Sequence, residues 1–193
     1  MIEQTKKKYK KPELVSPAGS MDKLKTAIEY GADAVYAGGK DFSLRNSAAN
    51  FTLDEIGSAV EYVHERGKKL YITLNIFAHN CHTSRMEQYL KELAEHPVDA
   101  VIIADPGVLS LVRDIMPDTA CHISTQANCT NTRAADFWYK QGVKRVVLAR
   151  ELSLNEVSEI SANSDCSTEV FVQGAMCLSY SGRCYLSSYM ANR

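Results

Sequence analysis

A residue that stops a helix is followed at once by a nearly continuous apolar run at three places in the chain. The runs begin at Ala32, Val98 and Val143, directly after Gly31, Pro97 and Gly142. Strands that are apolar at nearly every position are typical of a parallel sheet covered on both faces. The three starts are unevenly spaced, so the recurrence indicates an architecture and not a solenoid repeat.

Capping residues and helical stripes define the elements between these runs. Ser20 and Thr52 stand at helix starts, and Glu55 follows Thr52 at the spacing of a capping box. The pattern predicts seven strands, at residues 13–16, 32–37, 70–77, 98–104, 122–126, 143–149 and 169–172. It predicts six intervening helices, at residues 21–30, 53–66, 84–95, 108–115, 132–141 and 154–161.

Alternating strands and helices leave two architectures, the doubly wound open sheet and the closed eight-unit barrel. No Gly-x-Gly-x-x-Gly follows the first strand, and polar residues end nearly every strand, as expected where strand ends converge on one mouth. We therefore predict a parallel TIM-barrel-like α/β fold. A whole barrel takes about 250 residues, so we expect about seven of eight strands and a chain that is the N-terminal part of a longer protein. Uncovered strand edges favour association, while the number of subunits is left open.

Charge and targeting signals exclude several classes of protein. The 193 residues carry 22 Lys plus Arg against 23 Asp plus Glu, a net charge of -1, which gives no bulk attraction to nucleic acid or to a membrane surface. No segment has the pattern of a signal peptide or a spanning helix, so we expect a cytoplasmic protein without membrane association. Residues 1–12 are expected to form a flexible basic tail that could touch RNA phosphates, and residues 13–193 a barrel domain.

The predicted carboxyl ends of the strands carry the residues best suited to chemistry. Asp105 follows the fourth strand, Gln126 and Asn128 lie at the end of the fifth, and Arg150 and Glu151 follow the sixth. These five are the candidate catalytic residues, although loop residues are often polar only because they contact water. Arg150 is the best candidate for an anion-binding group, because a guanidinium can hold a carboxylate or phosphate through two parallel hydrogen bonds.

Cys177 and Cys184, just beyond the seventh strand, are candidate ligands for zinc or an iron–sulfur cluster. They supply two of the usual four ligands, and their spacing alone favours two unrelated cysteines. Cys129 could approach the same mouth, whereas Cys81 and Cys166 are expected in loops.

Other residues with reactive side chains lack a supporting context. His79, Cys81 and His82 do not have the spacing of a helical metal site and are expected in a hydrated loop. Ser124 and Ser181 lie outside any Gly-x-Ser-x-Gly motif, so neither has the context of an activated nucleophile.

Five ordered segments resemble peptidase family U32, the collagenase-like proteins. They are residues 14–20 (LVSPAGS), 36–39 (YAGG) with 42–45 (FSLR), 124–128 (STQAN), 145–152 (RVVLAREL) and 174–184 (GAMCLSYSGRC). The resemblance implies a barrel-like N-terminal domain followed by further sequence. It also implies that Cys177 and Cys184 are the first two ligands of a four-cysteine iron–sulfur site whose other ligands lie beyond Arg193.

The family carries two kinds of activity. One is proteolysis, and the other is hydroxylation of a tRNA wobble uridine with prephenate, of 23S ribosomal RNA or of the ubiquinone ring. The residues favour hydroxylation, because they offer soft ligands and an anion-binding arginine but no coherent protease site. The resemblance is greatest to the tRNA-hydroxylating branch, which implies tRNA as partner, an iron–sulfur cluster as cofactor and prephenate as co-substrate. The alternatives are a collagenase-like peptidase and a non-catalytic RNA-binding or scaffold protein.

Overall fold

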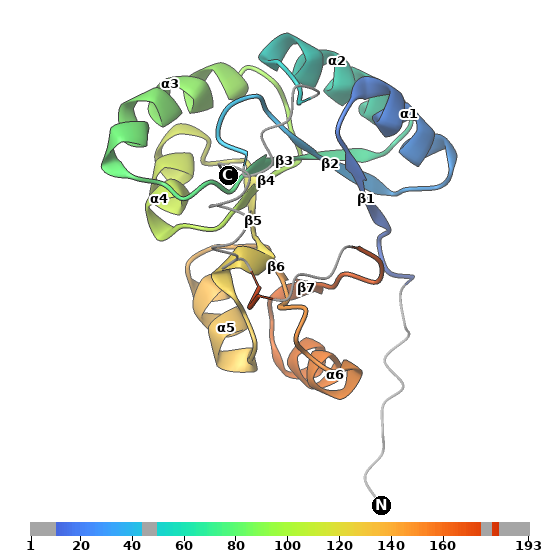
Figure 1. The fold of residues 1–193 in the computed structure, drawn as a ribbon, viewed down its shortest axis with the longest axis vertical. Coiled ribbons are helices and arrows are strands. Elements are labelled where there is room, and N and C mark those ends of the chain that lie inside the picture. Colours follow the sequence, from blue (N-terminus) through green and yellow to red (C-terminus); the bar gives the residue numbers. More distant parts are fainter. Residues whose placement is uncertain (1–10, 44–49, 175–178, 182–193) are drawn as a thin grey trace, which may run out of the picture.

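The computed structural model describes residues 11–43, 50–174 and 179–181. Its seven strands form one parallel sheet in which each strand pairs with the next along the chain, and the sheet curls into most of a barrel (Figure 1). The strands are β1 (Val15–Ala18), β2 (Ala34–Gly38), β3 (Lys69–Leu74), β4 (Ala100–Ile103), β5 (Ala120–Ile123), β6 (Arg145–Val147) and β7 (Ser167–Glu169). This order excludes the doubly wound sheet, whose strand order reverses, and confirms the predicted barrel-like fold.

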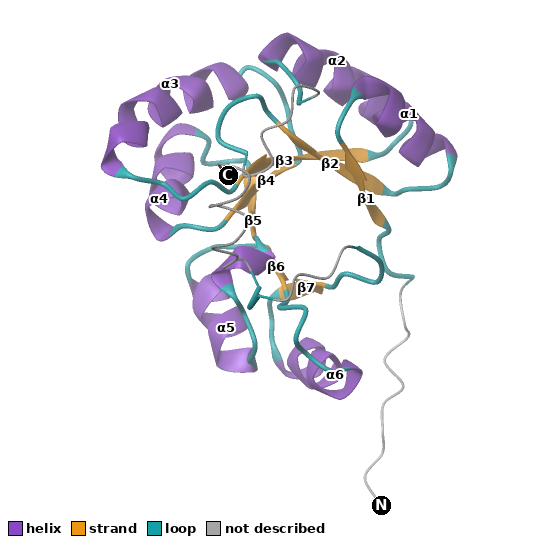
Figure 2. Ribbon diagram, viewed as in Figure 1, coloured by secondary structure: helices purple, strands orange, loops and turns teal. Residues whose placement is uncertain are grey.

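Helices follow strands β1 to β6 and lie on the outside of the curl (Figure 2). They are α1 (Met21–Glu29), α2 (Leu53–His64), α3 (Thr83–Leu93), α4 (Pro106–Ile115), α5 (Thr132–Lys140) and α6 (Leu154–Asn163), with short 3-10 helices η1 (Asn80–His82) and η2 (Thr125–Ala127) before α3 and α5. The capping box predicted for α2 is present, because Thr52 and Glu55 each accept a hydrogen bond from the backbone N–H of the other. Gly31, Gly67 and Gly142 follow α1, α2 and α5 with φ angles of 99°, 63° and 76°, a conformation that glycine adopts most easily.

Burial of both faces of the sheet explains the continuous apolar runs. In β3, Leu70, Ile72 and Leu74 belong to the main hydrophobic core shared with the helices, whereas Tyr71 belongs to a second, smaller core. Buried residues of the second core are Ala34, Tyr71, Ala100 and Ile102, which share the opposite, inner face of the curl. A slip of one residue would exchange the two sets of side chains, so the pattern also fixes the register of the strands.

The seventh strand lies two residues earlier than its apolar run predicts. β7 pairs with β6 over residues 167–169, which are Ser, Thr and Glu. Residues 170–172, on which the prediction rested, follow the strand, and Val172 is 86% exposed. The apolar run predicted the wrong bounds because the residues that pair with β6 are polar. One of them, Glu169, accepts a hydrogen bond from Arg145 of β6.

The predicted division into a tail and a barrel domain stays a prediction. Of residues 1–12, the structure describes Lys11 and Pro12, and Lys11 Nζ lies 4.0 Å from Asp33 Oδ2. In the described part of the chain, no helix is long and apolar enough to cross a membrane.

Side chains, and not a ladder of backbone hydrogen bonds, join the two ends of the described sheet. Arg145 Nη1 donates to Glu13 Oε1 at 2.8 Å, just before β1, and to Glu169 Oε2 in β7 at 3.2 Å. Glu13 also accepts from Lys69 Nζ at 2.9 Å and from the Tyr71 hydroxyl at 2.6 Å. We call these five residues the closing cluster. It ties the first and last strands to β3 and β6, at the end of the barrel where most of these strands begin.

The Arg145 guanidinium donates hydrogen bonds to both carboxylates of the closing cluster. Burial opposes the charge on Glu13, but hydrogen bonds from its three donors outweigh burial and lower its pKa from 4.5 to about 2. At Glu169 burial prevails over Arg145 and raises the pKa. Nearby, the His122 ring meets the Tyr71 ring at a centroid distance of 4.8 Å. Burial and then the charge of Arg145 lower the pKa of His122 to about 3, so this imidazole is neutral at physiological pH.

Replacing Arg145 with leucine should destabilise the fold strongly, because the largely buried Glu169 then loses its cation and Glu13 loses one of its two cation partners, Arg145 and Lys69. We expect the free energy of unfolding to fall by about 2–4 kcal/mol, less than for a fully buried pair because these side chains keep some contact with water. The matched control is Arg133→Leu, which removes an exposed arginine of α5 and should change stability by less than about 0.5 kcal/mol. Urea unfolding measures both, and equal losses would contradict a stabilising closing cluster.

The stabilising effect of Glu13 should disappear in acid. Because folding lowers its pKa from 4.5 to about 2, its contribution is complete above pH 4.5 and is lost as the pH falls through about 2. Folding raises the pKa of Glu169, so this group changes the stability with pH in the opposite direction to Glu13. The effect of Glu13 is therefore isolated by comparing the wild type with a variant that lacks only the Glu13 charge. We expect the stability difference between the wild type and Glu13→Gln to shrink over this range in denaturant titrations at stepped pH. A difference that stays constant would contradict the assignment.

Candidate active site

The carboxyl ends of β4, β5 and β6 bring the five candidate catalytic residues onto one stretch of the barrel rim. Asp105 follows β4, Gln126 and Asn128 follow β5, and Arg150 and Glu151 follow β6. These strands are neighbours in the sheet, so residues from separate parts of the sequence gather at the end where parallel barrels build active sites. Their catalytic roles stay predictions, and their contacts show what each side chain can do.

The Asp105 carboxylate caps a helix. Its Oδ1 accepts from the backbone N–H groups of Gly107 at 2.8 Å and Val108 at 3.1 Å, and Pro106 occupies the first position of α4. The cap fixes the carboxylate at the end of β4 and uses one of its two oxygens. Asp105 is therefore a rigid acceptor at the rim.

Gln126 links the ends of β3 and β5 across β4. Its Nε2 donates to the backbone carbonyl of Asn75 at 3.0 Å, and its Oε1 accepts from Ser124 Oγ at 3.1 Å. Ser124 is buried, and its own N–H donates to the carbonyl of Ile103 at the end of β4. Both ends of the amide are engaged, so Gln126 is a fixed part of the rim.

Asn128 has two features that are often found at functional positions. Its backbone lies in the left-handed region, at φ 55° and ψ 50°, which asparagine adopts more readily than most residues. Its Oδ1 is buried and has no hydrogen-bond partner among the described residues. Because a buried acceptor without a partner is costly, this atom is a candidate for contact with a bound donor.

Ser181 locks the turn that carries Arg150 and Glu151. Its Oγ accepts from the Arg150 N–H at 3.2 Å and donates to Glu151 Oε2 at 2.8 Å, and its N–H donates to Glu151 Oε1. Burial opposes the charge on Glu151, but the hydrogen bonds from Ser181 prevail and lower its pKa. The Arg150 guanidinium lies 5.6 Å from the centre of the Phe171 ring, so an aromatic face supports the candidate anion-binding group.

Sequence reasoning missed the role of Ser181. It identified this residue only as a serine without nucleophile context. Thirty positions separate Ser181 from Glu151, and no local spacing signals a contact over that distance.

The two predicted ligands, Cys177 and Cys184, lie outside the described residues. The cysteines that the structure does describe are four others. Cys121, Cys129 and Cys166 are buried free thiols. Burial raises the pKa of Cys121 and of Cys166 to about 11, and it also raises the pKa of Cys129. Thiols that hold their protons this strongly are poor metal ligands.

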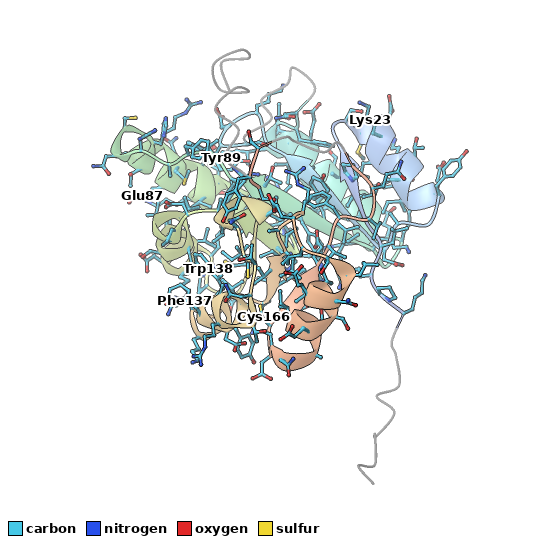
Figure 3. All side chains as sticks on the ribbon, turned by 60° about the horizontal axis from the view of Figure 1, so that its bottom comes forward. Lys23, Glu87, Tyr89, Phe137, Trp138 and Cys166 are labelled. Carbon is cyan, nitrogen blue, oxygen red and sulfur yellow. The ribbon has the colours of Figure 1, made fainter. Side chains whose placement is uncertain are left out.

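Two of these cysteines pack in the helix-side core. Cys129, which by its sequence position could approach the mouth, lies there with 1% of its surface exposed. Cys166 lies in the loop between α6 and β7, as predicted, and its side chain is buried in the same core (Figure 3). Within residues 11–43, 50–174 and 179–181, no group of three or more His, Cys, Asp or Glu side chains could hold a metal ion.

A groove of about 300 Å³ lies between the segment after β2 and helix α3. It is lined by Lys40, Asp41, Phe42, Phe51, Thr52, Leu53, Arg85, Gln88, Tyr89 and Glu92. Tyr89, on α3 (Figure 3), is 7% exposed, and its hydroxyl has no hydrogen-bond partner among the described residues. Gly39 passes so close to this hydroxyl that a side chain at position 39 would collide with it. The glycine therefore permits the close contact between the end of β2 and α3.

Comparison with known proteins identifies the family. The sequence profile of peptidase family U32 matches residues 19–193. The chain belongs to this family. The resemblance inferred from the five ordered segments is thereby confirmed.

Two relatives extend the U32 assignment. The chain is 47% identical over 184 residues to the tRNA hydroxylation protein P1 of Bacillus subtilis (strain 168), which covers 95% of this chain and 44% of that protein. It is 38% identical over 181 residues to the 23S rRNA 5-hydroxycytidine C2501 synthase of Escherichia coli (strain K12), which covers 94% of this chain and 27% of that protein. The chain thus spans less than half the length of either relative.

A solved U32 structure supports the fold. The U32 peptidase Mk0906 superposes with a TM-score of 0.69, covering 86% of this chain and 71% of that chain at 19% sequence identity. At this level of identity the likeness supports the barrel-like fold of the U32 chain and nothing further.

Substituting alanine for Gly39 should destabilise the protein by about 1–3 kcal/mol, because the new methyl group collides with the Tyr89 hydroxyl. The control is Gly19→Ala, since a side chain at Gly19 meets nothing within 4 Å. Thermal unfolding compares the two.

A second substitution tests the cause of this loss. Tyr89→Phe removes the unpaired hydroxyl and should by itself be nearly neutral, and the double variant Gly39→Ala with Tyr89→Phe should recover part of the loss. Fully additive effects would show that the hydroxyl is not the group with which the new methyl collides.

Proposed function

We propose that this chain is part of an enzyme that hydroxylates an RNA base, with the wobble uridine of tRNA as substrate. The observation that carries the proposal is the 47% identity to tRNA hydroxylation protein P1 over 95% of the chain. The similarity to a 5-hydroxycytidine synthase supports the same reaction class, because both names specify hydroxylation of RNA. A cytoplasmic location belongs to the proposal, since tRNA is used there.

The rim offers groups that suit such a reaction. Arg150, backed by Phe171, can bind an anion, either a phosphate of the RNA or a carboxylate of a small co-substrate such as prephenate. Asn128 adds an amide near Gln126, at a left-handed backbone position of a kind that is often found at functional sites. Asp105 and Gln126 are held rigidly, which suits orientation of a substrate.

The proposal includes an iron–sulfur cluster held by Cys177 and Cys184, with the remaining ligands supplied by sequence beyond Arg193. Thiolates are the usual ligands of such clusters, and when bound the cluster would supply one-electron chemistry. The buried thiols of Cys121, Cys129 and Cys166 are unsuited, because their raised pKa values keep them protonated. The pair at 177 and 184 has the family's motif to support it.

A peptidase requires an activated nucleophile or an open metal site. Ser181 does donate to a carboxylate, but it is 1% exposed, so its hydroxyl cannot reach a peptide bond. Ser124 is also buried and donates to the neutral amide of Gln126, which is no general base. The contacts of both serines therefore favour hydroxylation over proteolysis.

Mass spectrometry of tRNA nucleosides from a deletion strain tests the proposal. We expect 5-hydroxyuridine derivatives to be absent from the deletion strain and restored by the intact gene. Genes with Cys177→Ser or Arg150→Ala should fail to restore them, whereas Arg113→Ala, which changes an exposed arginine in the last turn of α4, at the end of the barrel opposite the rim, should restore them fully.

The alternatives give other results. Unchanged tRNA modification in the deletion strain, together with cleavage of gelatin by the purified protein, would favour the peptidase. Unchanged modification with RNA binding and no cleavage would favour a scaffold role.

A further inference from the structure

Two neighbouring connections of the barrel rim each carry an arginine. Arg133 lies in the first turn of α5, which follows β5, and Arg150 lies in the turn after β6. A backbone hydrogen bond joins the two connections, because the Ala149 N–H donates to the Cys129 carbonyl at 3.0 Å. The net charge of the whole chain is -1, so attraction to a polyanion has to come from a local group of cations such as this pair.

Arg133 lies where a cation does not stabilise its own helix. α5 has no acidic residue in its first turn, and a positive charge there lies beside the positive end of the helix dipole. The acidic residue of α5, Asp136, accepts a hydrogen bond from Ser164 Oγ at 2.7 Å. Arg133 is exposed and has no ion-pair partner in the part of the chain that the structure describes. Its position therefore suits a ligand better than it suits the helix.

Two exposed aromatic side chains are tied to the turn that carries Arg150. Phe171, which is 44% exposed, has its ring centre 5.6 Å from the Arg150 guanidinium carbon. Tyr180, which is 57% exposed, directly precedes Ser181, whose N–H and hydroxyl both donate to Glu151. Both rings thus belong to the rim beside β6. We call the following four residues the arginine–aromatic surface: Arg133, Arg150, Phe171 and Tyr180.

The chemistry of this surface matches single-stranded RNA. Guanidinium groups bind phosphates through charged hydrogen bonds, and unpaired bases stack on exposed aromatic rings. We propose that the arginine–aromatic surface binds the RNA chain beside the target nucleotide, with Arg133 on a backbone phosphate and Tyr180 stacked on an unpaired base. That the polyanion is RNA rests on the proposed function, whereas the exposure and charge of the surface rest on the structure.

The salt dependence of RNA binding tests the role of Arg133. The full-length protein is titrated with a fluorescently labelled, unmodified tRNA transcript at several salt concentrations. A contact with one phosphate of a single strand contributes about 0.7 to the slope of log affinity against log salt concentration. We expect Arg133→Gln to reduce the slope by about 0.7 and to weaken binding about fivefold at about 0.1 M salt. The matched control is Lys140→Gln, which removes an exposed cation from the last turn of the same helix and should change neither quantity.

Tyr180→Leu removes an aromatic ring without changing a charge. We expect about tenfold weaker binding with an unchanged salt slope, because stacking of a base on a ring releases no counterion. Tyr180→Phe keeps the ring and should bind RNA as the wild type does. The control is Tyr30→Leu, which removes an exposed ring at the end of α1, on the opposite end of the barrel from the rim.

Thermal unfolding separates binding from a structural role of Arg133. Because Arg133→Gln removes a cation from the positive end of a helix, this variant should melt no lower than the wild type. An unchanged salt slope in Arg133→Gln, or no binding of the transcript by the wild type, would overturn the surface. Loss of tRNA modification in cells that carry Arg133→Gln, with RNA binding unaltered, would point to a protein partner instead.

The titrations and the nucleoside analysis fail independently. The titrations measure only contact with RNA, whereas mass spectrometry of the deletion strain measures hydroxylation. The expected losses of binding, together with unchanged modification in the deletion strain, would leave the surface standing and reject the proposed function. Modification that depends on the gene, together with unaltered RNA binding by Arg133→Gln and Tyr180→Leu, would reject the surface and leave the function standing.

Discussion

The curled sheet that the structure describes has no backbone ladder between its first strand and its last. In this U32 chain the closing cluster joins the two strands through side chains. Arg145 places one cation between Glu13 and Glu169, which belong to opposite ends of the described sheet. Hydrogen bonds between charged groups suit this task because they are stronger than neutral ones, and the surrounding side chains exclude much of the water that would screen them.

The curl in turn determines what the rim can do. If the sheet were flat, the residues after β4, β5 and β6 would stand in a row along one edge. Curling turns those strand ends toward a common mouth (Figure 1), which brings the segments that carry Gln126, Asn128 and Arg150 nearer to one another. Asp105 and Gln126 are rigid because helix capping and side-chain bonds already engage them, whereas Asn128 keeps an acceptor without a partner in the described residues. The rim thus combines side chains that hydrogen bonds hold in place with one acceptor, Asn128 Oδ1, that has no hydrogen-bond partner among the described residues.

Features that depend on neighbouring residues could be predicted from the sequence, and features that depend on distant ones could not. Helix stops at Gly31 and Gly142 and the capping box at Thr52 are local, and all three are present. The curled parallel sheet followed from apolar runs, which report burial on two faces. The closing cluster could not be predicted, because Glu13 and Arg145 are 132 positions apart and a charged residue in a strand signals an exposed edge as readily as an interior pair.

The same limit explains the error at β7 and the burial of Cys129. Residues 167–169 form the strand because they pair with β6, although they are less hydrophobic than the residues that follow them. Cys129 follows a strand and could approach the mouth by its sequence position, but its side chain turns into the helix-side core. At Ser181 the local sequence is merely polar, and its importance comes from a carboxylate that thirty intervening residues bring back to it.

The sequential strand order has a consequence for how the chain acquires its shape. Because every strand pairs with its immediate neighbour in sequence, the sheet can grow from β1 onward as the chain leaves the ribosome, with each addition closing one connection that contains a helix. The bond between Glu13 and Arg145 is different, since it must wait until three quarters of the chain has been made. Until then Glu13 has Lys69 and Tyr71 as partners, which come from β3 and are synthesised much earlier. Arg145 is thus the last of the three donors to Glu13 to be synthesised, so the contact that joins the two ends of the described sheet is also the last of the three that can form.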